Sequence, residues 1–403
     1  MPRIANNIKK NDLSDLKEDV LCKYGKMLNK SVDCDKIAKV VSNKTKSYIN
    51  GITFKRIYGF TKYPYNPSAQ TLDLLSKYVG FENWIEYLSI KNQKSTISEQ
   101  EISLYKSIYN FDNINDVQNH EGGIQSISRQ IIKRIISAPD SFKIVTDSLV
   151  GNKWAQIFIF EHFPIYDCLI SFYHYAYIQY LENKKSKEAQ LFGNSILFLN
   201  AFWKFDHVEA LKRIKKINET GISHEVHPFV IGRYFASNLY YNYFFTSNNT
   251  NHFVERIIEF ENQIKIEPNH FKNFPAFHYI VSEALLHCNY FKETIGIVDI
   301  ALKKYQFKKE FAKKGYYRQM LMFKADALIE LGDKRKAQLI MKKVNPDNFY
   351  FISKKYYTTL YHLLQFKINP NQISKDVSKR YIIEMQNSFL NKKYQSIIGE
   401  VCF

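Results

Sequence analysis

The chain has 403 residues, with 57 Lys or Arg against 39 Asp or Glu, and a formal net charge of +18. This length exceeds what one hydrophobic core usually serves, so we expect at least two domains. An apolar content of 45% excludes a disordered chain. The positive charge favours an anionic partner such as nucleic acid, a phosphate-rich ligand or a membrane surface, although a lysine excess also follows from an AT-rich genome.

The cysteine pattern and the absence of apolar runs indicate a cytoplasmic protein. The five cysteines are widely spaced and none forms a C-x-x-C pair, which argues against a disulfide framework or a zinc site. Residues 1–12 are polar and lack the apolar core of a signal peptide. The most apolar run, residues 157–163, contains Glu161 and ends before Pro164, far short of the roughly 18 residues of a membrane helix.

Apolar periodicity predicts five short helices in residues 13–92. The first runs from about 13 to 29 and the second from about 35 to 42, with apolar residues at a spacing near 3.6. Asn50 is the expected N-cap of the third helix, and Gly59 is its expected C-terminal stop.

Turn residues set the remaining boundaries of this first domain. The fourth helix is expected between Ser68 as N-cap and Gly80 as stop. Asn83 opens the fifth, with a glutamate three residues later as in a capping box. Residues 62–67 contain two prolines and predict a loop. Residues 91–99 are polar and predict a linker to a second unit.

Residues 36–72 contain no acidic residue. Their basic residues are Lys36, Lys39, Lys44, Lys46, Lys55, Arg56 and Lys62. A compact helical unit with an unopposed positive face attracts the phosphate backbone of a DNA duplex. The pattern therefore predicts a DNA-binding domain over residues 13–92. The alternative is that the charge is only the solvated face of a small structural bundle.

Residues 37–88 resemble an N-terminal helix-turn-helix-like domain of regulator-like proteins from Bacteroidetes-type bacteria. The matching residues are Ile49, Thr53, Phe54, Lys55, Arg56, Gly59, Phe60, Pro67, Ser68, Thr71, Leu72, Asp73, Leu75, Tyr78, Gly80, Trp84 and Leu88. Phe54 departs from the usual leucine, and Asn50-Gly51 replaces serine-rich capping; Gly51 would loosen the first turn by about 1 kcal/mol relative to alanine. The resemblance implies DNA binding, often by a domain fused to a helical-repeat sensor.

On this interpretation the third helix enters the major groove. Thr53, Lys55 and Arg56 would face outward, with Arg56 able to make a bidentate contact to guanine. The residues expected to anchor the helix are Phe54, Ile57 and Tyr58. The residues expected to contact phosphate are Lys44, Lys46, Lys62 and Tyr63.

The second domain is expected to cover residues 93–403 as an α-solenoid. A strong amphipathic helix is predicted over 124–136, and Pro139 interrupts the chain after it. From residue 167 onward, helices and short turns alternate. The predicted helices are 167–183, 187–203, 206–218, 228–246, 252–265, 276–290, 291–305, 315–331, 333–344, 349–366 and 373–391. The inner turns near Asn249, Asn289, Gly332 and Pro370 recur about every 40 residues, as in helical-hairpin repeats.

Residues 282–294 and 324–337 resemble tetratricopeptide hairpins, the second more closely. In it, the small Ala325 and Ala337 let two helices approach, and Gly332 makes the tight turn. The spacing exceeds the roughly 34 residues of that repeat, so the hairpins are best described as tetratricopeptide-like. Such solenoids often present a concave face to a peptide or protein. The candidate residues for that face are Arg233, Asn238 and Asn242.

Other chemistry has little support in the sequence. His224 and His227 are spaced one residue short of the zinc-protease pattern and have no third ligand, so we expect no metal site. Cys168 and His174 would lie on opposite sides of a helix, which favours packing over catalysis. Gly122-Gly123 is expected to be a turn. Basic residues between 303 and 318, interleaved with aromatics, are more simply a charged connector than a nucleic-acid groove.

The sequence thus predicts an all-α protein with two functional alternatives. The first is a cytoplasmic transcriptional regulator that binds double-stranded DNA through residues 13–92, with a solenoid that binds a peptide, a protein or a second protomer. The second is a protein-interaction scaffold that does not bind DNA. An enzyme acting on nucleic acid lacks a supporting constellation of carboxylates or histidines, and we expect no enzymatic activity and no cofactor.

Overall fold

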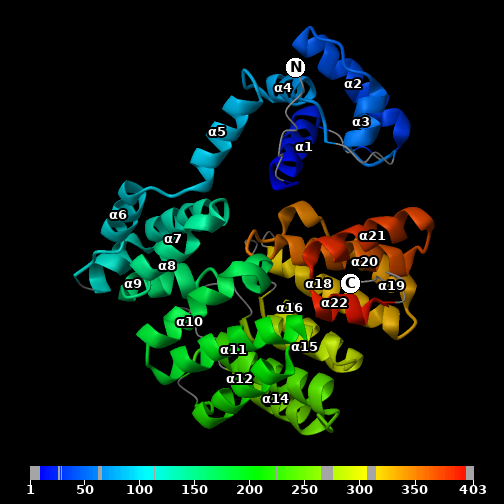
Figure 1. The fold of residues 1–403 in the computed structure, drawn as a ribbon. Coiled ribbons are helices and arrows are strands. Elements are labelled where there is room, and N and C mark those ends of the chain that lie inside the picture. Colours follow the sequence, from blue (N-terminus) through cyan, green and yellow to red (C-terminus); the bar gives the residue numbers. More distant parts are fainter. Residues whose placement is uncertain are drawn as a thin grey trace. The chain divides into compact units, whose positions relative to one another are not determined.

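A computed structural model describes residues 10–25, 28, 30–61, 66–112, 114–223, 226–264, 276–305 and 315–395 of the chain. All regular secondary structure in these ranges is helical, which confirms the predicted all-α class (Figure 1). The chain divides into two compact units. The first holds residues 1–97 with 137–140, and the second holds 98–136 with 141–403.

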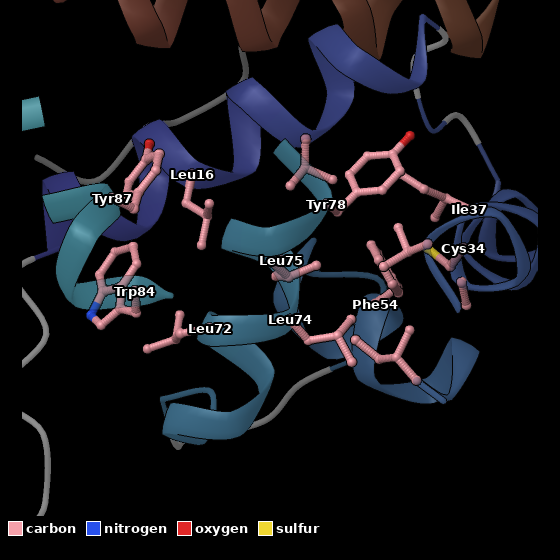
Figure 2. Close-up of a cluster of buried hydrophobic side chains, with 14 residues drawn as sticks. Leu16, Cys34, Ile37, Phe54, Leu72, Leu74, Leu75, Tyr78, Trp84 and Tyr87 are labelled. Carbon is pink, nitrogen blue, oxygen red and sulfur yellow. The ribbon is translucent and has the colours of Figure 1, made fainter. Parts of the chain in front are cut away.

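The first unit contains five short helices around one apolar core. They are α1 (Lys10–Tyr24), α2 (Ser31–Thr45), α3 (Gly51–Ile57), α4 (Ala69–Val79) and α5 (Trp84–Ser95). Side chains from all five meet in the core, which includes Leu16, Ile37, Phe54, Leu75 and Tyr87, each without exposed surface (Figure 2). Burial of these side chains is the main driving force for folding of the unit.

Local capping explains where these helices begin and end. The Asn50 side chain accepts the N–H of Ile52 at 3.0 Å, and Ser68 accepts that of Thr71 at 3.3 Å. Gly59 and Gly80 have φ of 79° and 116°, left-handed conformations that favour glycine at a helix end. These predicted boundaries are confirmed. The predicted linker at 91–99 is wrong in part, because α5 continues to Ser95.

The second unit begins at the N-cap Ser98, whose side chain and the Glu101 carboxylate form a capping box. The helices before the repeats are α6 (Glu99–Ile108), α7 (Ile114–Ile136), α8 (Phe142–Leu149) and α9 (Lys153–Ala155). The short turn η1 (Pro139–Ser141) precedes α8, and its first two residues belong to the first unit. The π-helix η2 (Gln156–Glu161), the 3₁₀ turn η3 (Tyr166–Cys168) and the π-helix η4 (Leu169–Tyr173) follow. The turn expected at Gly122-Gly123 is wrong, since both glycines lie within α7.

The rest of the second unit is a series of helical hairpins. Its helices are α10 (His174–Asn183), α11 (Lys187–Lys204), α12 (His207–Thr220), α13 (Pro228–Tyr240), η5 (Tyr241–Thr246), α14 (Asn251–Gln263), α15 (Ala276–His287), α16 (Phe291–Tyr305), α18 (Gly315–Glu330), α19 (Lys334–Met341), η6 (Pro346–Asn348), α20 (Lys354–Ile368), α21 (Gln372–Met385) and α22 (Ser388–Lys393). Most of these bounds lie within three residues of the predicted ones. The predicted helix 167–183 is instead divided into η3, η4 and α10, 228–246 into α13 and η5, and 373–391 into α21 and α22, and the helix predicted from 349 begins at Lys354.

Packing between the hairpins builds two layers of helices. Helices α11, α13, α15, α18 and α20 each contact the next, and α12, α14, α16, α19 and α21 each pack on the helix that precedes them. This is the predicted helical-hairpin solenoid. Close approach needs small residues: a Cβ on Gly232 of α13 would lie 3.2 Å from the Cβ of Ile280 in α15. Ala325 and Ala337 are likewise fully buried between α18 and α19.

The last hairpin packs back onto the first segments of the repeat region. The N–H of Asp167 donates to the carbonyl of Ile352 at 3.1 Å, and the rings of Trp203 and Tyr356 stack at 5.0 Å. The segments at the two ends of the repeat region therefore contact each other. Polar groups on the inner layer of helices are buried in the protein rather than presented to solvent.

Candidate functional site

The α2–α3 pair carries the basic stretch singled out in the sequence. The chain leaves α2 at Lys46, which has φ of 53°, and re-enters helix at Gly51. Gly51 is buried against α2, and a Cβ there would lie 1.9 Å from Oδ1 and 3.0 Å from Cα of Asp35. Glycine therefore allows the start of α3 to approach α2, and this close approach offsets its weak helix propensity.

Aromatic packing fixes α3 on the core of the first unit. Phe54 has no exposed surface, and its ring stacks on Tyr58 with the centroids 5.9 Å apart. The hydroxyl of Tyr58 donates to the carbonyl of Lys17 in α1 at 2.9 Å, and burial raises the pKa of that hydroxyl. Ile57 is half-buried against the same core. These contacts are those expected of anchoring residues, and Figure 2 shows Phe54 among the core side chains of the first unit.

The three residues expected to face outward differ in exposure. Arg56 is exposed, whereas Thr53 and Lys55 are half-buried. The Lys55 ammonium lies 3.0 Å from Oδ2 of Asp35, and its side chain keeps only 22% of its surface exposed. Lys55 therefore ties α3 to α2, and its charge is largely neutralised by the carboxylate of Asp35.

Exposed positive charge remains along α2, the turn after it and α3. Lys39, Lys44, Lys46 and Arg56 are all exposed. Lys44 Nζ lies 5.7 Å from the centroid of the Tyr78 ring, a cation–π contact that leaves the ammonium accessible. The predicted contacts Lys62 and Tyr63 lie outside the described residues.

Apolar side chains lie beside this charge. Tyr48 keeps 83% and Ile52 keeps 48% of its surface exposed, although both flank the buried start of α3. Lysine and arginine next to an exposed aromatic ring can contact phosphate oxygens and the sugar or base beside them. Together with the four exposed basic residues, this surface can hold an extended polyanion.

The residues expected on a partner-binding face lie instead among packed helices. Arg233 and Asn238 keep 5% and 2% of their surface exposed, and Asn242 is half-buried. Arg233 donates to the hydroxyl of Tyr166 at 2.7 Å and lies over the Tyr166 ring. Arg233 and Asn238 lie in α13, which packs between α11 and α15, and Asn242 lies in η5, so polar periodicity here does not indicate an open face.

The inner helices contain a buried network of hydrogen bonds that the sequence did not predict. Tyr279 donates to the hydroxyl of Tyr357 at 2.6 Å, and Tyr357 donates to Glu283 Oε1 at 3.0 Å. Tyr356 also hydrogen-bonds the Glu283 carboxylate. Burial raises the pKa of Glu283 to about 7, while the nearby Arg233 opposes that rise. No motif marks these residues, because they come from helices more than 70 positions apart.

The same hydrogen-bond network extends through His287 to Lys393. His287 Nε2 lies 3.2 Å from the hydroxyl of Tyr356, and His287 Nδ1 lies 3.0 Å from Lys393 Nζ. Burial holds the pKa of His287 well below its usual range, so the imidazole is neutral. An ammonium can only donate, so Nδ1 accepts from Lys393 and the imidazole proton sits on Nε2.

The described residues offer little for metal or thiol chemistry. They contain no group of three or more His, Cys, Asp or Glu side chains placed to hold a metal ion. His227 caps α13 by accepting the N–H of Phe229, and His224 lies outside the described ranges. Burial raises the pKa of Cys168 to about 12, which keeps its thiol protonated. In the second basic cluster, Lys304 pairs with Glu261, while residues 306–314 are not described.

Comparison with protein-family models, with curated proteins and with solved structures finds no match to this chain. Its class therefore rests on its own fold, a small helical unit joined to a helical-hairpin solenoid. None of the described helices combines the length and apolar character that crossing a membrane requires.

Proposed function

We propose that the protein is a DNA-binding transcriptional regulator. Its first unit would bind double-stranded DNA through α2 and α3, and its second unit would sense or bind a partner. The residues that resemble the regulator-like N-terminal domain lie in α3, α4 and α5 and in the segments that flank these helices. A two-fold operator would require a homodimer, as in other helix-turn-helix regulators.

The observation that carries the proposal is the distribution of charge on the first unit. Between residues 36 and 72 every charged side chain is basic. Of the flanking acids, Asp33 and Asp35 lie in the first half of α2 and pair with Lys36 and Lys55. The stretch itself contributes the exposed Lys39, Lys44, Lys46 and Arg56 and contains no acid.

The proposal divides the predicted DNA-binding residues into two roles. Lys44, Lys46 and Arg56 contact phosphate, and the long side chain of Arg56, in the last turn of α3, also reaches a base edge. Lys55 holds α3 on α2 through Asp35 and positions it, rather than reading sequence itself.

The test is fluorescence anisotropy of the full chain on a mixed-sequence duplex over a series of salt concentrations. Lys44→Ala, Lys46→Ala and Arg56→Ala combined should lower affinity and reduce the salt slope by about 1 per lost contact. The matched control replaces three exposed lysines of the second unit, Lys334, Lys342 and Lys343. Equal affinity and equal slope in both triple variants would refute DNA binding by this surface and favour the scaffold alternative.

A further inference from the structure

The second unit contains a cavity of about 140 Å³ beside the last short helix. Its aromatic walls are Phe205, Tyr243, Phe244 and Phe389. Phe205 follows α11, Tyr243 and Phe244 belong to η5, and Phe389 belongs to α22. Three parts of the chain thus converge on one apolar space of roughly the size that accepts a single aromatic ring.

Unusual backbone conformations hold these walls in place. Phe205 has φ of 56° and Asn289, also in the lining, has φ of 64°. For a bulky residue such as Phe205 this left-handed conformation is unfavourable. Tyr243 and Phe244 lie on a π-helix, which is rare and is found most often at functional sites. Such features cluster where a protein shapes a ligand site.

Two ammonium groups face this aromatic space. Lys392 Nζ lies 4.5 Å from the centroid of the Phe205 ring, and Lys393 also lines the cavity. Lys393 is half-buried, and among the described residues no carboxylate lies within ion-pair distance of it. The nearby acids Asp326 and Glu330 are instead engaged by Lys367, at 2.6 and 2.7 Å.

The ammonium of Lys393 keeps its charge at neutral pH. Burial lowers its pKa to about 8, so it remains mostly protonated at pH 7. Its hydrogen-bond partner in the protein is the neutral ring of His287, at 3.0 Å. Asp326 and Glu330 favour the charged form only from beyond ion-pair distance. A desolvated ammonium whose hydrogen-bond partner is neutral is unfavourable, and an anion in the adjoining cavity would relieve that cost.

We propose that this cavity binds a small aromatic carboxylate. The ring would pack against the wall that Tyr243, Phe244 and Phe389 form, and the carboxylate would accept hydrogen bonds from the ammonium groups of Lys393 and Lys392. Aromatic walls favour an aromatic body through offset and edge-to-face contacts, and charge-assisted hydrogen bonds to lysine favour a carboxylate. This site is independent of the proposed DNA surface, because every lining residue belongs to the second unit.

The test measures 4-fluorobenzoate binding to the full chain by ¹⁹F NMR. We expect saturable binding, with Lys393→Met weakening it about tenfold or more and Lys392→Met weakening it less. The matched control, Lys342→Met, changes an exposed lysine of the same unit and should leave the affinity unchanged. Lys393→Met removes a half-buried charge and keeps the length of the side chain, so it should fold at least as well as the parent; circular dichroism checks this.

Two probes separate the recognition of the ring from that of the charge. The neutral 4-fluorobenzamide and the non-aromatic trifluoroacetate should each bind about tenfold more weakly than 4-fluorobenzoate. Equal binding of 4-fluorobenzamide would overturn the role of the lysines, and equal binding of trifluoroacetate would overturn the role of the aromatic walls. Undiminished binding to folded Lys393→Met would place the probe elsewhere and overturn the site.

Discussion

Asp167 and Tyr356 lie 189 positions apart, yet Oδ1 of Asp167 accepts the backbone N–H of Tyr356 at 3.0 Å. The second oxygen of the same carboxylate accepts the N–H of Lys355 at 2.8 Å. Both N–H groups belong to the first turn of α20, whose own N-cap, Ser353, makes no side-chain capping bond. A residue at the start of the repeat region thus caps a helix near its end, where a negative charge also complements the helix dipole.

Removing this distant cap should destabilise the second unit. We expect Asp167→Ala to lower the free energy of unfolding by about 1–2 kcal/mol, the usual cost of losing an N-cap. Urea unfolding followed by circular dichroism measures it. Asp376→Ala is the control, because among the described residues that exposed carboxylate accepts only from Gln372 in its own helix. A loss no larger than that of the control would show that the contact contributes little to stability.

Gly51 should tolerate no larger side chain. Gly51→Ala places a methyl group against Asp35, displaces the carboxylate that pairs with Lys55, and should destabilise the first unit by about 1–3 kcal/mol. Gly122→Ala is the matched control, since nothing lies within 4 Å of its Cβ in α7 and alanine should stabilise that helix by up to about 1 kcal/mol. Thermal unfolding of the two variants should therefore shift in opposite directions.

Lys55 and Arg56 should affect different properties although they are neighbours. Lys55→Ala breaks the ion pair with Asp35 and should lower the stability of the first unit by up to about 1 kcal/mol. Arg56→Ala should lower duplex affinity, with a salt slope smaller by about 1. Paired unfolding and anisotropy measurements check this division. The opposite assignment of effects would show that Lys55, and not Arg56, contacts DNA.

Glu283 should make stability depend on pH. Burial raises its pKa from 4.5 to about 7, so the folded state holds this proton to higher pH than the unfolded chain does. Its contribution to stability is therefore complete below pH about 4.5 and is lost as pH rises through about 7. Asp167, with its pKa raised to about 6 by burial, acts in the same direction.

Glu283→Gln isolates this effect. The variant retains a hydrogen-bond acceptor for Tyr357 but cannot titrate. We expect the difference in unfolding free energy between parent and variant to change by on the order of 2 kcal/mol between pH 5 and pH 8, in favour of the variant at pH 8. Urea unfolding at the two pH values gives this difference. A constant difference would mean that Glu283 titrates alike in both states.

The sequence by itself determined the elements that depend on local interactions. Asn50, Ser68 and Gly80 mark helix ends because a cap or a left-handed glycine acts within one turn of the chain. The hairpin repeat was visible for the same kind of reason, since its turns recur at regular spacing and small residues such as Ala325 and Ala337 lie on its contact faces.

Only the tertiary structure decided which polar residues are buried and which partners they have. Arg233 has the polar character of a surface residue, but α13 is covered on both sides, and its partner Tyr166 is 67 positions away. Lys55 finds Asp35 only because α3 packs on α2. His287 and Lys393 meet across 106 positions beside the cavity. No local pattern encodes these pairs, because long-range packing of apolar helix faces brings them together. The same packing buries them and so sets how strongly their charges interact.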